Sequence, residues 1–322
     1  MIIEPKFYVP IIPMLLVNGA EGMGTGWSTS IPTFNPLDLI DVLNTLLDSP
    51  NAQNAKIPTL KMWARGFKGV IEQNGNDKFT AKGVYAVKQK GGSIEMDISE
   101  LPIGEWTEHF KTHLLNLASK DVIKPKFSER NTESTVGFTI TINSSEITPS
   151  LLKKLKLEKS FSMTNMTAFS ANQEIVQYSN IEEMIKQFYV VRIEYYEKRK
   201  AYQIAHLEKQ SRVLTNKVKF LDYITSGDSN LKQFMKTKRE DLPSFLKTVV
   251  GVEIGQSESI SYLTDMSLIS LTMENKEKLA KQLETIKADL NNVKADTAKQ
   301  MWRRDLQKLK EELISLKQQW IV

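Results

Sequence analysis

The pattern of apolar and polar residues is most regular in the C-terminal part of the chain, which is predicted to be helical from Ile181 onward. Apolar residues recur there three, four and seven positions apart, as on one face of a helix. They are Ile204, Leu207, Leu214, Val218 and Leu221. A second series alternates steps of four and three, as in a coiled coil. Its members are Leu279, Leu283, Ile286, Leu290 and Val293, then Leu306, Leu309, Leu313, Leu316 and Trp320.

The second apolar series is interrupted once. Between Val293 and Leu306 the register slips by one residue, which a continuous heptad repeat would not do. We therefore predict a break or bend near Asp296. A continuous helix from Leu279 to Leu316 would extend roughly 56 Å.

Less regular residues, about 226–272, separate the two helical stretches. This arrangement predicts an antiparallel coiled coil capped by a small globular insert. A stalk with an apolar tip could hold two copies of the chain together. The apolar side chains of the insert are candidates for that contact and equally for a local core: Phe234, Phe245, Leu246, Val249, Val250, Tyr262, Leu263 and Met266.

Residues 60–145 have short apolar runs that are cut by glycine and turn residues. Strands are predicted where these runs are β-branched or alternate with polar residues, over 66–72, 79–87, 93–98 and 135–142. Helices are predicted over 106–117 and 147–157. The sequence therefore predicts a mixed unit of helices and strands, preceded by a helix that Asn35 caps and Pro36 begins.

The segment before that helix, residues 4–36, combines prolines, glycines and large apolar residues. Met23 is a single bulky residue between Gly22 and Gly24, and glycine leaves the backbone free to approach a ligand. Such a side chain could act as a wedge that enters and unstacks a base step. A tight turn that buries Met23 in the core is the alternative interpretation.

The glycines of this segment fit neither of the common phosphate-binding motifs. A P-loop ends in Gly-Lys-Ser/Thr, whereas this chain has Gly26-Trp27-Ser28. A dinucleotide-binding unit needs a helix directly after the glycines, whereas Ile31-Pro32 follows here.

Composition narrows the class of protein further. The formal net charge of +5 and the pI near 9.0 suit a polyanionic partner. The chain has no cysteine, which removes disulfides, zinc fingers and thiol catalysis. We find no signal peptide and no apolar run long enough to cross a bilayer, and therefore expect an intracellular protein without a membrane partner.

Several blocks of sequence follow one another in a characteristic order. They are EPKFYVPIIPMLLVNGAEGMGTGW from Glu4, Glu100-Leu101-Pro102 with Trp106-Thr107, SMTNM from Ser162, FYVVRIEYYEKRK from Phe188, SYLTDMSLISLT from Ser261, and Met301-Trp302 with Asp305-Leu306. Together they resemble the type IIA DNA topoisomerases of the eukaryotic kind. In that family the first block follows the winged-helix region that bears the catalytic tyrosine.

The resemblance implies an α+β N-terminal part followed by an all-α antiparallel coiled coil with a small dimerisation insert. The expected divisions are 1–58 for the end of the winged-helix region at the DNA gate, 59–178 for a tower-like DNA-binding domain, 179–225 for the first coiled-coil helix, 226–272 for the dimerisation insert of the C-terminal gate, and 273–322 for the returning helix.

The resemblance also implies contacts with the gate DNA. Met23 stands where the family has an isoleucine that intercalates and bends the duplex, and Asn18 and Thr25 are expected to bind DNA in the same segment. Lys61 and Arg65 would add phosphate-directed charge. A departure is Gly104-Glu105, where relatives often carry an arginine-threonine pair, which puts a phosphate contact there in question.

A second DNA contact is implied for the segment from Lys156 to Asn165. By its residues alone, this segment joins lysines to hydroxyl and amide side chains, which suits phosphate binding without sequence readout. An amphipathic helix followed by a polar strand is the alternative. The residues expected to bind DNA are Lys156, Lys159, Ser160, Ser162, Thr164 and Asn165.

The family's catalytic tyrosine, with the arginine before it, lies upstream of Glu4-Pro5, so no catalytic residue is expected in this chain. ATP and Mg²⁺ would serve the complete enzyme and be bound by upstream parts. His109 and His113 lack the further ligands of a metal site, and we interpret them as a solvated pair.

Two functions follow from the resemblance. The chain is expected to be part of an ATP-dependent type II topoisomerase, inactive alone, which binds and bends gate DNA and forms a homodimer through its C-terminal gate. The upstream portion would act in cis or in trans, in a eukaryotic nucleus or in the cytoplasm or nucleus of a virus-infected host. The alternative is a non-catalytic, dimeric, architectural DNA-binding protein.

Overall fold

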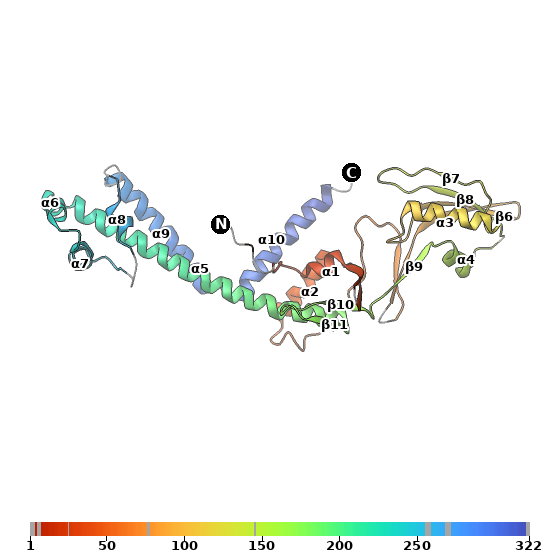
Figure 1. The fold of residues 1–322 in the computed structure, drawn as a ribbon, viewed down its shortest axis with the longest axis horizontal. Coiled ribbons are helices and arrows are strands. Elements are labelled where there is room, and N and C mark those ends of the chain that lie inside the picture. The colour runs from red at the N-terminus through yellow and green to blue at the C-terminus, as the bar shows by residue number, and fades with distance from the viewer. Residues whose placement is uncertain are drawn as a thin grey trace. The chain divides into compact units, whose positions relative to one another are not determined.

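The computed structural model describes residues 4, 8–24, 26–75, 78–144, 146–254, 259–267 and 272–319. The chain divides into two compact units. Unit 1 comprises Met1–Arg192 with Asp305–Val322, and unit 2 comprises Ile193–Arg304. Strands and short helices fill the N-terminal part and long helices the C-terminal part (Figure 1), which confirms the predicted α+β class. No helix of the described ranges is long and apolar enough to cross a membrane.

Unit 1 begins with a helix, a hairpin and a second helix: α1 Met14–Asn18, β1 Ala20–Gly24, β2 Trp27–Ile31 and α2 Pro36–Asp48. The predicted start of α2 is confirmed, because Asn35 Oδ1 accepts a hydrogen bond of 3.0 Å from the Leu37 amide and Pro36 takes the first position. The helix buries one apolar face that includes Leu39, Ile40 and Leu43.

Two antiparallel sheets follow. One has the strand order β3-β4-β9 and the other β5-β6-β8-β7. Their strands are β3 Val70–Gln73, β4 Lys78–Lys82, β5 Val84–Lys90, β6 Ser93–Glu100, β7 Ser128–Glu129, β8 Phe138–Ile142 and β9 Glu158–Ser162.

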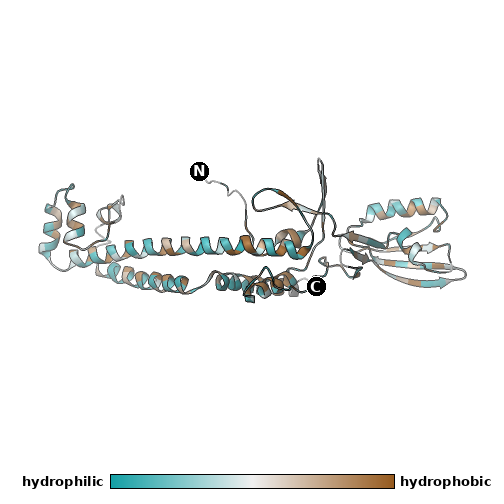
Figure 2. Cartoon of the chain, turned by 90° about the horizontal axis from the view of Figure 1, so that it is seen from below, coloured by the Kyte–Doolittle hydropathy of each residue, from teal (hydrophilic) through white to brown (hydrophobic). Residues whose placement is uncertain are grey.

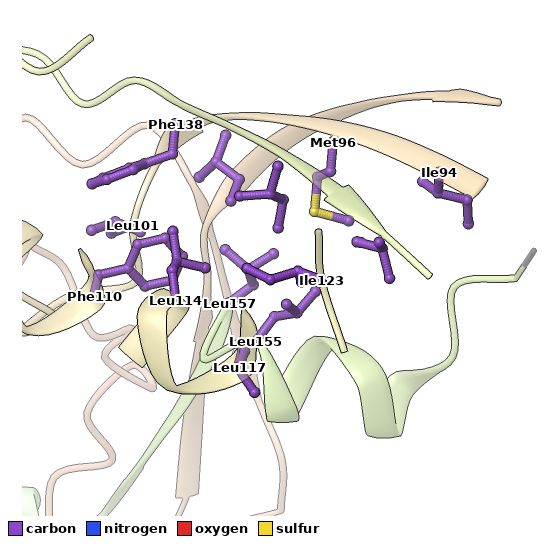
Figure 3. Close-up of a cluster of buried hydrophobic side chains, with 13 residues drawn as sticks. Ile94, Met96, Leu101, Phe110, Leu114, Leu117, Ile123, Phe138, Leu155 and Leu157 are labelled. Atoms are coloured by element: carbon purple, nitrogen blue, oxygen red, sulfur yellow. The ribbon is translucent and has the colours of Figure 1, made fainter. Parts of the chain in front are cut away.

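The larger sheet packs against α3 Thr107–Ser119 around one apolar core (Figure 3). Inward residues alternate along β6 and β8, as expected for a sheet with one buried face. The rings of Phe110 and Phe138 meet edge to face, with 5.1 Å between their centroids. Helix α4 Pro149–Lys154 lies beside this core.

The prediction of a single strand over 79–87 was wrong. Gly83 divides it into β4 and β5, which belong to different sheets. The Gly83 amide donates to the Leu157 carbonyl at 3.0 Å, and a Cβ atom at Gly83 would lie 2.4 Å from the carbonyl oxygen of Glu100. Only glycine fits where the chain passes from one sheet to the other.

Three other predicted boundaries were too wide. The strand expected from residue 66 begins at Val70, and the strand expected from residue 135 begins at Phe138. The helix expected to end at residue 157 ends at Lys154, because Lys156 takes a left-handed backbone conformation with φ +55°. The chain then continues as β9.

A second hairpin leads from the sheets to the long helices. Its strands are β10 Met166–Phe169 and β11 Ile175–Tyr178, and α5 Ile181–Thr225 follows directly. The predicted helical start at Ile181 is confirmed.

In unit 2, α5 pairs with α9 Met273–Ala295 in antiparallel fashion, and the two run side by side in Figures 1 and 2. Lys294 lies 2.7 Å from Glu208, and Lys276 forms an ion pair with Asp222. The predicted break is also confirmed: α9 ends at Ala295, Asp296 caps it, and α10 Ala298–Gln319 begins anew.

The insert between α5 and α9 carries three short helices, α6 Asp228–Lys236, α7 Leu242–Thr248 and α8 Ser261–Thr264. Their apolar side chains form a small core with the end of α5. The ring of Phe234 lies 5.2 Å from that of Phe220 and 6.4 Å from that of Phe245. Four candidates for a dimer contact thus pack locally: Phe234, Phe245, Tyr262 and Met266.

Candidate nucleic-acid interface

Met23 lies near the tip of the β1–β2 hairpin and points into open space. It pairs with Ser28 across the hairpin, and its side chain is 93% exposed. A Cβ atom built on Gly22 or Gly24 would meet no other atom within 4 Å. The interpretation that Met23 is buried in the core is therefore wrong, and the side chain has the free approach that a wedge requires. Thr25 lies outside the described residues.

The base of the hairpin is tightly built. Gly19 has φ +67°, and its amide donates to the Leu15 carbonyl at 2.9 Å. A Cβ atom at Gly19 would lie 2.7 Å from the Ile31 carbonyl oxygen, so this turn requires glycine. Asn18 immediately precedes the turn and is thereby placed at the foot of the hairpin.

Hydrogen bonds attach the hairpin to the polar segment that ends at Asn165. The Asn165 side-chain amide donates to Ser28 Oγ at 2.7 Å, and its carbonyl accepts from the Ser30 amide at 2.8 Å. The Thr167 amide donates to Thr29 Oγ1 at 3.2 Å. Strand β2 is therefore supported along its length by the start of β10.

Within the polar segment, the hydroxyl groups are engaged with one another. Ser162 Oγ lies 2.9 Å from Thr164 Oγ1, and Ser160 Oγ lies 3.2 Å from Thr80 Oγ1. The hydroxyl groups that could donate to phosphate thus make short polar contacts along β9 and just after it. This arrangement agrees with the polar-strand interpretation and leaves phosphate binding as a prediction.

The lysines of this segment turn toward the loop before α3. Lys156 Nζ lies 3.3 Å from Glu105 Oε1, and Lys159 Nζ donates to the Gly104 carbonyl at 3.1 Å. The sequence alone did not indicate these contacts, because the two segments are about fifty residues apart. The departure at Gly104-Glu105 was the signal that could have pointed to them.

One hollow joins the foot of the hairpin to β9 and the loop before α3. Its lining includes Asn18, Glu21, Gly104, Lys159 and Phe161. The structure therefore brings together two predicted DNA-binding residues, Asn18 and Lys159, that are far apart in the sequence. Lys61 and Arg65 are exposed on either side of Met62, which also lines the hollow.

Other charged groups near this surface are paired. Lys82 Nζ lies 2.6 Å from Glu72, and the hydrogen bond with that carboxylate raises the pKa of Lys82. Burial raises the pKa of Glu100, and the charge of Lys68 opposes this effect.

The described residues fit no metal ion. That part of the chain contains no group of three or more histidine, aspartate or glutamate side chains that could hold one. His113 and His109 are not a simple solvated pair, because His113 Nε2 lies 2.8 Å from the Lys154 carbonyl oxygen and links α3 to α4.

Comparison with known proteins agrees with this geometry. The family model for the A-type subunit of DNA gyrase/topoisomerase IV matches residues 1–307. Mitochondrial DNA topoisomerase 2 of Dictyostelium discoideum is 39% identical over 97% of this chain and 24% of its own length, and DNA topoisomerase 2 of Penicillium chrysogenum is 32% identical over 95% of this chain and 21% of its own.

A solved structure is also similar. The crystal structure of the Plasmodium falciparum topoisomerase II DNA-binding, cleavage and re-ligation domain matches with a TM-score of 0.79 and 30% identity, over 98% of this chain and 46% of that one. The chain spans about a quarter of the length of the curated relatives it matches. By the extent and order of these matches, the chain belongs to the DNA gyrase/topoisomerase IV family, in the group of its A-type subunits.

Proposed function

We propose that this chain is part of a type II DNA topoisomerase, in which it binds and bends the gate duplex and joins two protomers. The observation that carries the proposal is the exposure of Met23 on a hairpin whose base is fixed. An apolar side chain held in this way can enter a base step, and the energy lost by unstacking is offset by the contacts that bent DNA makes.

Phosphate contacts would hold the duplex in register beside this wedge. Asn18 and Lys159 share one hollow, and Asn165 supports the hairpin directly. Such contacts position a duplex without reading its sequence, which suits an enzyme that acts on many sites. Thr25, Lys61, Arg65, Lys156, Ser160, Ser162 and Thr164 are further candidates for this role.

The insert of unit 2 would join two copies of the chain. Because the aromatic candidates pack into the local core, its exposed apolar side chains are better placed for the contact. Met235 on α6 is 73% exposed, and Val249 after α7 is also exposed. A homodimer held at this end would form the C-terminal gate.

The chemistry of strand cleavage belongs to an upstream portion that acts in cis or in trans. That portion would supply the tyrosine nucleophile, the site for Mg²⁺ and the site for ATP. The described residues of this chain do not fit a metal site, so the metal is assigned to the upstream portion.

Relaxation of supercoiled plasmid tests the proposal. The chain would be assayed alone and mixed with a separately expressed upstream portion that carries the tyrosine, in the presence of ATP and Mg²⁺. Relaxation by the mixture but by neither part alone is expected. If the chain dimerises and binds duplex but the mixture does not relax plasmid, the result would favour a non-catalytic architectural protein.

A further inference from the structure

The tight turn before α3 places a carboxylate against the basic end of β9. The Glu105 amide donates to the Pro102 carbonyl at 3.0 Å, and Gly104 has φ +76°. A Cβ atom at Gly104 would lie 2.8 Å from Lys159 Nζ. Glycine therefore permits both the turn and the approach of this lysine.

The two lysines rest on oxygen atoms of this turn. Lys156 faces the Glu105 carboxylate and Lys159 the Gly104 carbonyl. The side chain of Glu105 is only 14% exposed, whereas that of Lys156 is 45% exposed. The carboxylate is thus held in place by its surroundings, while the ammonium group remains open to an incoming ligand.

The backbone of Lys156 is also fixed. It has φ +55°, and its amide donates to the Lys153 carbonyl at 3.0 Å. The side chain therefore starts from a defined point beside Glu105. A phosphate group presents to an ammonium group the same kind of charged oxygen that the carboxylate presents.

Resting on the proposed function, we propose that Glu105 occupies the place of a DNA phosphate on Lys156 and that duplex binding displaces it. A carboxylate and a phosphate repel each other, so they compete for one ammonium group. Glu105 thereby weakens the grip of this surface on DNA. A lower affinity suits a protein that must release its duplex.

The test compares Glu105→Gln with Glu108→Gln. Both variants remove one negative charge from the start of α3, but only the first removes the partner of Lys156. Binding of the full chain to a fluorescent duplex would be measured by anisotropy over a series of KCl concentrations. Glu105→Gln is expected to bind about two- to fivefold more tightly, the range that exposed ion pairs imply. The slope of log affinity against log salt should steepen by about 0.9.

A double-mutant cycle locates the effect. Lys156→Met should erase the gain given by Glu105→Gln, because no ammonium group is left to release. Equal affinities and slopes for Glu105→Gln and Glu108→Gln would overturn the proposal. Weaker binding by Glu105→Gln would overturn it too, since Glu105 would then orient Lys156 for DNA. If the unaltered chain shows no salt-dependent duplex binding, the proposed function itself fails and this proposal with it.

Discussion

The side chain of Asn165 donates a hydrogen bond of 2.7 Å to Ser28 Oγ, and so joins two segments that lie 137 residues apart in the sequence. This bond holds β2, and through it the hairpin that carries Met23, against the start of β10. The orientation of the exposed methionine therefore depends on a residue outside the hairpin.

We expect Asn165→Ala to loosen the hairpin. The lost hydrogen bond should lower the free energy of unfolding by about 0.5–1.5 kcal/mol. Amide hydrogen exchange should become faster in β1 and β2, and bending of a duplex should fall, though less than when Met23 is removed. Asn172→Ala, in the turn after β10, is the matched control and should change none of these quantities.

Trp302 is central to the packing of unit 2. It is fully buried, and its ring stacks on that of Tyr196 with 5.7 Å between centroids. Trp302→Ala should lower the free energy of unfolding by about 3–5 kcal/mol, measured by denaturant titration. Tyr202→Ala removes an aromatic ring from the same long helix as Tyr196, but this ring is 70% exposed, so a loss below about 1 kcal/mol is expected. Equal losses for Trp302→Ala and Tyr202→Ala would refute this account of the packing.

Glu100 should make stability depend on pH. Burial raises its pKa in the folded state, so the folded chain binds this proton more tightly than the unfolded chain does. Stability is therefore lost as the pH rises from the unfolded pKa of about 4.3 through the folded pKa, and the loss persists at neutral pH.

Glu100→Gln removes this loss. At pH 7 the variant should be more stable than the unaltered chain by less than about 1 kcal/mol, because the carboxyl group is only partly buried. At pH 3.5 the two should be equally stable in urea titrations. Glu133→Gln, in the exposed loop before β8, should have no such effect at either pH. A Glu100→Gln variant that is less stable at pH 7 would contradict the assigned cause.

Met235 tests the dimer contact. Met235→Glu should weaken self-association by at least about tenfold, because it places a charge in an apolar interface. The helical content should be unchanged, since the side chain is exposed in the single chain. Sedimentation velocity over a range of concentrations measures this. Phe245→Glu should instead unfold the insert, because that ring lies in its local core.

The sequence predicts the helical parts better than the sheets, for a physical reason. The start of α5, the cap of α2 and the break near Asp296 depend on residues a few positions apart, and all three were predicted. The division at Gly83 depends on the carbonyls of Leu157 and Glu100, which no local pattern brings near. Long-range pairing therefore decided where the strands end.

The candidate site shows the same limit. The glycines around Met23 predicted a wedge or a buried turn, and only the fold decides that the side chain is exposed. The contact between Lys156 and Glu105 joins two segments that local patterns treat separately. For the insert, apolar character alone could not tell a dimer contact from a local core, because both bury the same kinds of side chain.

The bend that this chain imposes on a duplex is the quantity to measure first, by fluorescence transfer between dyes at the two ends of a short DNA. Met23→Ala should reduce the bend and leave dimerisation unchanged, while Met23→Ile should retain the bend because it keeps an apolar wedge. Met273→Ala, which removes an exposed methionine from the start of α9, is the control and should bend DNA normally. An undiminished bend with Met23→Ala would contradict the role of the hairpin as a wedge.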